Sequence, residues 1–146
     1  MRAPLQVRFE KLQRLIERVS YEAEQGRIIV VEGAKDRESL RRMGVTGRIL
    51  CLKGGRNNIT GFAEGLSGEK GVIVLTDFDR EGVFLAKRLS RVLTSLSIQA
   101  NLLLWRELRS LTRSDLRSVE ELPGFYERLH AELSFRRSPS EPRHRS

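Results

Sequence analysis

The sequence predicts an α/β protein built on a four-stranded parallel sheet with helices on both faces. Two observations carry this prediction. Short runs rich in β-branched and other apolar residues recur four times between residues 27 and 105, and each has the length of a strand buried on both faces. Segments with apolar residues at helical spacing separate these runs, which is the alternation of strands and helices that covers a parallel sheet.

The first half of the pattern begins with a long helix. Residues 5–24 carry apolar side chains at alternating spacings of four and three, which places them on one helical stripe. Residues 27–32 form the first predicted strand, and a short helix over 36–43 follows it. Residues 48–52 form the second strand, and we expect the next helix to begin with Asn57 or Asn58 as its N-cap.

The second half of the pattern repeats the alternation and then weakens. The predicted elements are a helix over 57–66, a strand over 72–76, a helix over 81–96, a strand over 100–105 and a last helix over about 124–134. We therefore expect an N-terminal helical extension over 1–25, the α/β domain over 26–105, a C-terminal helical segment over 106–134 and a tail over 135–146. The tail is rich in Arg, Ser and Pro, so we expect it to be basic and disordered.

Composition limits the classes of partner and site. The chain has 146 residues, with 27 Lys and Arg against 19 Asp and Glu, so its net charge is +8. Such a charge favours polyanionic partners: RNA, DNA or phosphate-rich substrates. With one Cys and two His, a disulfide framework and a Cys- or His-based metal site are excluded, and carboxylates would have to hold any metal. No apolar run approaches the roughly 20 residues that cross a bilayer and no leader segment is evident, so we expect no membrane partner and a cytoplasmic protein.

Acidic residues follow two of the predicted strands. Glu32 ends the first strand, and Asp77 and Asp79 follow the third, two residues apart, so that in extended backbone they point the same way. Functional groups collect at the carboxyl ends of parallel strands. If the first and third strands are neighbours, the three carboxylates face one crevice, and such hard oxygen ligands suit Mg²⁺, with Mn²⁺ as a possible substitute.

Each acid also has a structural interpretation. Glu32 followed by Gly33 is compatible with an ordinary turn, and Asp79 is compatible with the N-cap of the next helix, with Glu81 in its first turn. A loop acid can serve both purposes. The sequence therefore predicts a metal site without excluding a cap.

Basic residues accompany the same strand ends. Lys35, Lys53, Arg56 and Arg80 follow or flank them and are candidates for binding phosphate. The glycine-rich loop that begins at Lys53 leads to a predicted helix N-terminus, where backbone N–H groups can meet phosphate. It is not a Walker A loop, because the spacing and the Lys-Ser/Thr pair are missing, and an ordinary strand-to-helix turn explains it equally well.

Two segments resemble a known family. Val31–Asp36 and Asp77–Gly82 lie about 45 residues apart, and together they are similar to the Glu-Gly and Asp-x-Asp-x-Glu-Gly motifs of the Toprim domain, which has a Rossmann-like fold. Toprim domains occur in type IA and type II topoisomerases, bacterial-type primases, OLD-family nucleases and the ribonuclease that matures 5S ribosomal RNA. The resemblance covers about residues 26–105, and the size of the chain is similar to that of small stand-alone Toprim proteins.

The resemblance implies a role for each matching acid. Glu32 matches the general acid or base of strand cleavage and joining, Asp77 and Asp79 match the pair that binds Mg²⁺, and Glu81 matches the third acid of many members. Without metal, repulsion among these carboxylates should raise the pKa of one of them. The chain departs from topoisomerases and primases, because it offers neither a separate domain with a tyrosine nucleophile nor zinc and polymerase regions.

We therefore expect a Mg²⁺-dependent Toprim protein that acts on nucleic acid phosphodiesters, with nuclease-like RNA processing as the first hypothesis and RNA ahead of DNA as partner. The alternative is a nucleic-acid-binding or ribonucleoprotein accessory module, which keeps a metal site but has little catalytic activity alone. A third possibility is a subunit that completes its active site with a protein partner. The sequence leaves open whether the chain is an enzyme.

Overall fold

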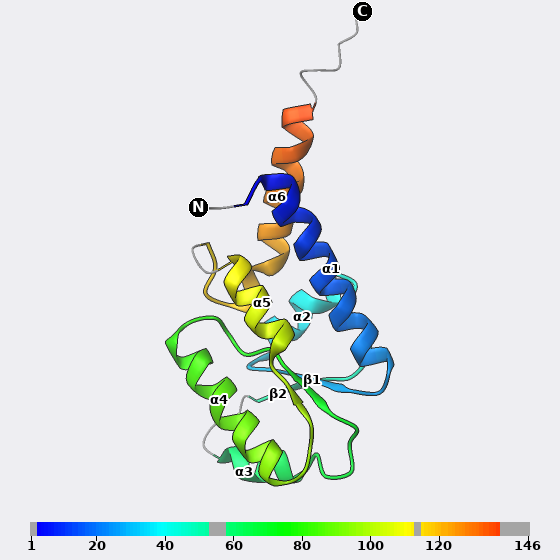
Figure 1. Ribbon diagram of the computed structural model, residues 1–146, viewed down its shortest axis with the longest axis vertical. Helices are drawn as coiled ribbons and strands as arrows, with labels where there is room; N and C mark the ends of the chain where they lie inside the picture. The colour runs from blue at the N-terminus through cyan, green and yellow to red at the C-terminus, as the bar shows by residue number, and fades with distance from the viewer. Residues whose placement is uncertain (1–2, 53–57, 113–114, 138–146) are drawn as a thin grey trace, which may run out of the picture.

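The computed structural model describes residues 3–52, 58–112 and 115–137 (Figure 1). The helices are α1 (Leu5–Glu24), α2 (Ala34–Arg42), α3 (Ile59–Glu64), α4 (Arg80–Ser95), α5 (Leu103–Thr112) and α6 (Leu122–Arg137), with a short 3₁₀ helix η2 (Val119–Glu121) before α6. The strands are β1 (Ile28–Val31), β2 (Ile49–Cys51), β3 (Val72–Val74) and β4 (Ala100–Asn101).

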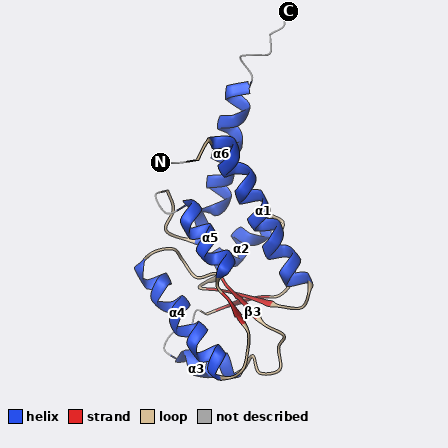
Figure 2. Ribbon diagram, viewed as in Figure 1, coloured by secondary structure: helices blue, strands red, loops and turns tan. Residues whose placement is uncertain are grey.

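The sheet has four strands in the order β2-β1-β3-β4, and every neighbouring pair is parallel. Helices α3 and α4 lie on one side of it, and α1, α2, α5 and α6 lie on the other (Figures 1 and 2). After β2 the chain crosses back past β1 to β3, and the next helices, α3 and α4, lie on the face of the sheet opposite α2. The predicted α/β fold is confirmed.

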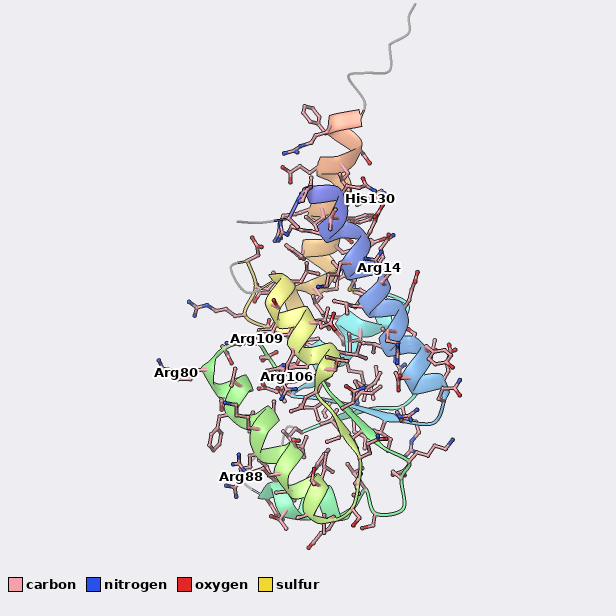
Figure 3. All side chains as sticks on the ribbon, viewed as in Figure 1. Arg14, Arg80, Arg88, Arg106, Arg109 and His130 are labelled. Atoms are coloured by element: carbon pink, nitrogen blue, oxygen red, sulfur yellow. The ribbon has the colours of Figure 1, made fainter. Side chains whose placement is uncertain are left out.

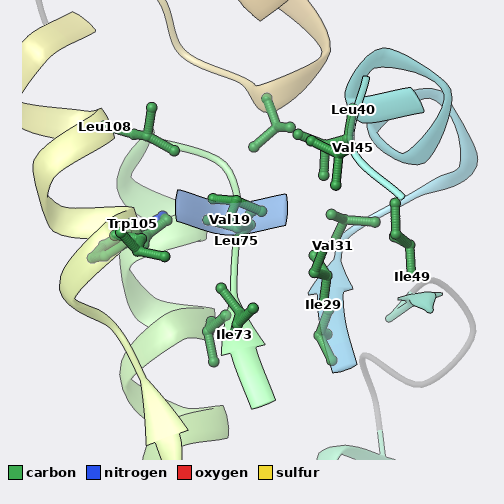
Figure 4. Packing of buried hydrophobic residues seen from close by; sticks show 14 of the residues in the cluster. Val19, Ile29, Val31, Leu40, Val45, Ile49, Ile73, Leu75, Trp105 and Leu108 are labelled. Carbon is green, nitrogen blue, oxygen red and sulfur yellow. The ribbon is translucent and has the colours of Figure 1, made fainter. Parts of the chain in front are cut away.

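Strands β1 and β3 are buried on both faces, as the sequence predicts, whereas the edge strands β2 and β4 are partly buried. All four residues of β1 have no exposed surface. Side chains of β1 and β3 gather with Val19 of α1, Leu40 of α2 and Leu108 of α5 on one face (Figure 4), and alternate strand residues point to the other face. Within the described part of the chain, no helix is both long enough and apolar enough to cross a membrane.

The predicted fourth strand is wrong beyond its first two residues. Strand β4 ends at Asn101, and α5 begins at Leu103. The side chain of Asn101 accepts a hydrogen bond from the backbone N–H of Leu103 at 2.9 Å, which turns the chain into the helix. Short apolar runs are compatible with either a strand or a buried helix, and this run, with Trp105 at its end, belongs mostly to a helix.

Two helix termini also refine the prediction. Asn58 is the N-cap of α3, and its side chain accepts from the N–H of Gly61, whereas Asn57 lies outside the described residues. Helix α6 continues to Arg137, so the first three residues of the predicted disordered tail, 135–137, are helical. The rest of that tail, 138–146, lies outside the described residues.

Candidate active site at the carboxyl ends of β1 and β3

The candidate site lies where the direction of strand order reverses. Helix α2 leaves β1 toward one face of the sheet and α4 leaves β3 toward the other (Figure 1), so a crevice opens between the carboxyl ends of these neighbouring strands. A cleft is present there, and the residues that line it include Glu32, Gly33, Lys35, Asp36, Asp77 and Glu120. The structure therefore brings the acids of the first and third strands together.

Glu32 and Asp77 are joined by a hydrogen bond. The backbone N–H of Asp77 donates to Oε2 of Glu32 at 2.9 Å, and Glu32 is only 7% exposed. In a continued parallel ladder, this N–H would donate to the backbone carbonyl of Glu32. The side chain takes the place of that carbonyl at the end of the sheet, which fixes the carboxylate of Glu32 beside Asp77.

Asp77 itself is held by the segment that precedes α6. Its Oδ1 accepts a hydrogen bond from the backbone N–H of Val119 at 3.0 Å. The neighbouring N–H of Phe78 donates to the carbonyl of Arg117 at 2.7 Å. The sequence analysis missed this support, because backbone donors leave no mark in the residue types.

The carboxyl group of Asp77 has a raised pKa. The pKa of Asp77 is raised to about 7: burial is the largest cause, the hydrogen bond from Val119 opposes the shift, and the nearby charges of Asp36, Glu32 and Asp79 add to it. The expectation that one clustered acid has a raised pKa is confirmed. The larger cause is desolvation rather than the repulsion that the sequence suggested.

Asp36 is an acid of the cleft to which the sequence analysis assigned no role. Its Oδ2 accepts from the backbone N–H of Gly33 at 3.0 Å, which caps the start of α2, and the residue is 6% exposed. Burial and the charge of Glu120 raise the pKa of Asp36, although its backbone hydrogen bonds oppose the shift. Only the half of a capping box in which the N3 side chain accepts from the N-cap N–H is present, because Gly33 has no side chain. The spacing of Gly33 and Asp36 was therefore a weak signal in the sequence.

Asp79 and Glu81 have the positions that the structural interpretation gave them. Asp79 is the N-cap of α4, and its Oδ1 accepts from the N–H of Gly82 at 2.8 Å. Glu81 lies exposed in the first turn of α4. Neither is among the residues that line the cleft. The described residues contain no group of three or more Asp, Glu, His or Cys side chains that could hold a metal ion.

The donor set nevertheless fits a hard cation. Mg²⁺ is usually held by one or two carboxylates, and water and substrate phosphate complete its ligands, so a cage of three carboxylates is not required. The charges that raise the pKa of Asp77 come from Asp36, Glu32 and Asp79. A divalent cation at this place would offset that repulsion, so the arrangement is compatible with Mg²⁺ or Mn²⁺.

The predicted phosphate-binding residues divide into three cases. Lys35 is exposed and lines the cleft. Arg80 is the first residue of α4 and points away from the body of the protein (Figure 3). Lys53 and Arg56 lie outside the described residues.

Helix α5 supports the loop that carries Asp77. The indole Nε1 of Trp105 donates to the carbonyl of Thr76 at 2.8 Å, and Nε of Arg109 donates to the carbonyl of Phe78 at 3.0 Å. The two bonds hold the residues on either side of Asp77. Trp105 is 4% exposed, so it is a core residue and offers no surface on which a base could stack. Its supporting role was missed, because the sequence placed it on a strand.

Close packing requires a glycine at position 82, the last residue of the Asp77–Gly82 motif. A Cβ atom at this position would overlap the backbone carbonyl of Asp77. Helix propensity alone predicts that Gly82→Ala stabilises α4 by up to about 1 kcal/mol. Because the clash is with backbone, we expect instead a loss of about 1–3 kcal/mol or more, measured by urea denaturation.

The matched control is the glycine of the first motif. A Cβ atom at Gly33 meets nothing within 4 Å, and its φ of −147° suits any residue. Gly33→Ala should therefore cost less than about 1 kcal/mol, the effect of a weaker N-cap. Equal losses of stability in the two variants would contradict the argument from close approach.

Comparison with known proteins gives the chain relatives over most of its length. The family model of the Toprim domain matches residues 27–103. A UPF0292 protein of Thermococcus kodakarensis is 36% identical over 120 residues, which cover 82% of this chain and 89% of that protein. A UPF0292 protein of Thermoplasma volcanium is 40% identical over 101 residues, which cover 68% of this chain and 82% of that protein.

A solved structure is also similar. A protein from Aquifex aeolicus superposes with a TM-score of 0.61 at 23% identity, covering 74% of this chain and 94% of that one. This similarity shows a shared fold.

Proposed function

Because the chain belongs to the Toprim domain family, which indicates a metal-dependent function related to nucleic acid, we propose that it is a Mg²⁺-dependent cytoplasmic protein that cleaves nucleic acid phosphodiesters. We propose RNA ahead of DNA as its substrate and RNA processing as its activity. The observation that carries this proposal is the hydrogen bond between Glu32 and Asp77 at the carboxyl ends of neighbouring strands.

Each acid of the two sequence motifs has a proposed part. Asp77 and Asp79 hold the ion, and Glu81 in the first turn of α4 is the third acid. When bound, Mg²⁺ supplies positive charge that offsets the charge on the phosphate. Glu32 gives or takes the proton, because its carboxylate is fixed in the same cleft as Asp77.

The basic residues of the proposal hold the substrate rather than react with it. Lys35 lies at the cleft and attracts a phosphate there. Arg80 extends this phosphate binding to the start of α4, and Lys53 and Arg56 are proposed to add to it from their positions in the sequence after the second strand. Together they position the phosphodiester for proton transfer by Glu32.

One observation favours a second candidate function. No group of three or more potential ligands lies close together among the described residues, and Asp79 is engaged as a helix cap. A nucleic-acid-binding or ribonucleoprotein accessory module would need only the binding surface and a weak metal site. Incubation of labelled structured RNA and DNA with Mg²⁺ and with chelator separates the two functions. Mg²⁺-dependent cleavage supports the nuclease, and binding without cleavage supports the module.

A metal titration tests the metal-binding residues directly. We expect Mn²⁺ to bind the wild type and to bind the Asp77→Ala/Asp79→Ala variant at least about 10-fold more weakly. Even the loss of a residue that only hydrogen-bonds to a metal ligand lowers metal affinity roughly 10–100-fold. The enhancement of water proton relaxation by Mn²⁺ measures both affinities.

The control for that titration removes two acids elsewhere. Glu10→Ala/Glu17→Ala takes the same charge from exposed positions of α1 and should leave Mn²⁺ binding unchanged. Unchanged binding in the Asp77→Ala/Asp79→Ala variant would overturn the assignment of the metal ligands.

A further inference from the structure

The solvent-facing side of α4 carries basic and aromatic side chains in one row. This row, the α4 stripe, consists of Arg80, Phe84, Lys87, Arg88 and Arg91, all of them exposed. Their spacing of three and four residues places them on one face of the helix. The opposite face carries the buried residues Leu85, Ala86, Leu89 and Leu93.

The charged groups of the α4 stripe have no side-chain or backbone partner in the part of the chain that the structure describes. Within the described residues, the side chains of Arg80, Lys87, Arg88 and Arg91 make no ion pair and no hydrogen bond. Some exposed arginines elsewhere do: Arg18 pairs with Glu22, Arg42 with Glu127 and Arg48 with Glu69. Like charges at helical spacing destabilise a helix, so the folded chain itself gains nothing from this row.

Phe84 interrupts the cations with an exposed ring. It is 57% exposed, whereas the leucines of α4 at 85, 89 and 93 are buried. A single exposed apolar side chain is ordinary on a protein surface. A ring set among four cations is what a platform for an unpaired base requires, because bases stack on aromatic faces while phosphates pair with the surrounding charges.

The α4 stripe begins three residues after Asp77, which lines the cleft. Arg80 directly follows Asp79, the N-cap of α4. From Arg80 to Arg91 the helix rises by about 16 Å. Arg80 and Arg88 point away from the protein on the same side of α4 (Figure 3). The acids at the start of α4 are Asp79, its N-cap, and Glu81 in the first turn, and Glu64 lies on the packed helix α3. The α4 stripe carries four cations, more than these three acids.

We propose that the α4 stripe binds a single-stranded segment of nucleic acid and leads it to the cleft at Asp77. The proposal rests on the function proposed above, because the strand that it leads is the substrate of that site. At about 3.4 Å per stacked nucleotide, 16 Å of helix accommodates roughly five nucleotides. Phe84 favours a single strand over a duplex as the ligand, because only an unpaired base can stack its face on the ring.

The electrostatic part is tested by binding without metal. Fluorescence anisotropy of a short labelled single strand, in chelator and at several salt concentrations, gives the affinity and its salt dependence. We expect Arg88→Ala/Arg91→Ala to weaken binding and to lower the salt slope by about 1.4, since each phosphate contact of a single strand contributes about 0.7.

The control removes the same charge from other helices. Arg14 on α1 and Arg106 on α5 are exposed arginines without ion pairs among the described residues (Figure 3), and Arg14→Ala/Arg106→Ala should change the slope little. If this variant loses as much as the α4 variant, diffuse charge explains binding and the proposal is overturned.

The stacking part is tested by Phe84→Ala. We expect the affinity for a single strand to fall roughly 5- to 150-fold, the range of stacking losses on alanine substitution, and the affinity for a duplex to change little. Tyr21 on α1 is equally exposed, at 56%, so Tyr21→Ala is the matched control. Equal losses at Phe84 and Tyr21, or equal affinity of the wild type for single strand and duplex, would overturn the proposal.

Parallel measurements with RNA and DNA of one sequence identify which strand the α4 stripe prefers. The outcomes also separate this proposal from the proposed function. If the wild type cleaves RNA while the α4 variants keep full affinity, the binding role of the α4 stripe is wrong and the proposed nuclease activity is supported. If the α4 variants lose affinity and no strand is ever cleaved, the α4 stripe stands and the nuclease is wrong.

Discussion

We expect Glu32→Gln to lower the rate of phosphodiester cleavage about 10²–10⁴-fold, the contribution of a general acid or base. Glutamine keeps the size and polarity of the side chain but cannot give or take a proton. Its amide oxygen can still accept the hydrogen bond that Asp77 donates to Glu32, so the fold should be retained. Affinity for nucleic acid should hold or rise, because one negative charge near the phosphate is removed.

The measurement combines three readouts on one preparation: single-turnover cleavage, binding affinity and melting temperature. Glu38→Gln, at an exposed position of α2, removes the same charge outside the lining of the cleft and should leave the cleavage rate unchanged. Glu32→Ala should in addition lose about 1–3 kcal/mol of stability, because it leaves the N–H of Asp77 without its acceptor. Wild-type cleavage by Glu32→Gln would falsify the assignment of Glu32 as the proton-transfer group.

The second large effect concerns Asp77 and the stability of the metal-free protein. Burial and neighbouring acids raise the pKa of Asp77 to about 7 in the folded protein, against about 3.9 in the unfolded chain. The folded state therefore holds this proton more tightly. The contribution of Asp77 to stability is complete below about pH 4 and is lost as the pH rises to about 7. Metal-free wild type should accordingly melt at a lower temperature at pH 8 than at pH 5.

Asp77→Asn removes the cause of that loss. Its amide oxygen can still accept from the N–H of Val119, as Asp77 does, so we expect the variant to melt on the order of 3–8 °C higher than wild type at pH 8 in chelator. Its melting temperature should vary less between pH 5 and 8. The control is Asp79→Asn, which keeps an N-cap side chain on α4 and removes only the smallest of the charges that raise the pKa of Asp77, so it should change both properties much less.

Mg²⁺ should reverse the order of the melting temperatures of the wild type and Asp77→Asn. An ion that binds only the folded state raises stability with its concentration, so added Mg²⁺ should raise the melting temperature of the wild type and have little effect on Asp77→Asn. Calorimetric or fluorescence melting with and without Mg²⁺ measures this. An Asp77→Asn variant that is less stable than wild type in chelator would show that Asp77 serves the fold rather than a site.

The sequence was sufficient for the elements whose local pattern agrees with the fold. The strands at Ile28–Val31 and Val72–Val74 were predicted because their residues are apolar and β-branched at every position, which favours a strand in a sheet covered on both faces. The caps at Asn58 and Asp79 were predicted because a polar side chain at a helix start meets N–H groups only a few residues away.

The prediction failed where a local pattern has two solutions. The run that ends at Trp105 is apolar without a clear period, and the hydrogen bond from Leu103 to Asn101 turns it into a helix. Trp105 then donates to the loop beside Asp77 instead of ending a strand. A short apolar run does not determine its own secondary structure, because the neighbours that bury it do so.

By itself, the sequence determined that acids stand at the ends of the first and third strands, because chain order and strand length place them there. Only the tertiary structure decided which of them meet. The pairing of β1 with β3 brings Asp77 to Glu32 across 45 residues, and the capping of α2 brings Asp36 to the same cleft. Asp79 and Glu81 instead lie at the N-terminus of α4, outside the lining of the cleft. Which carboxylates share a cleft depends on where helices leave the sheet, and that direction is set by packing between segments distant in the chain.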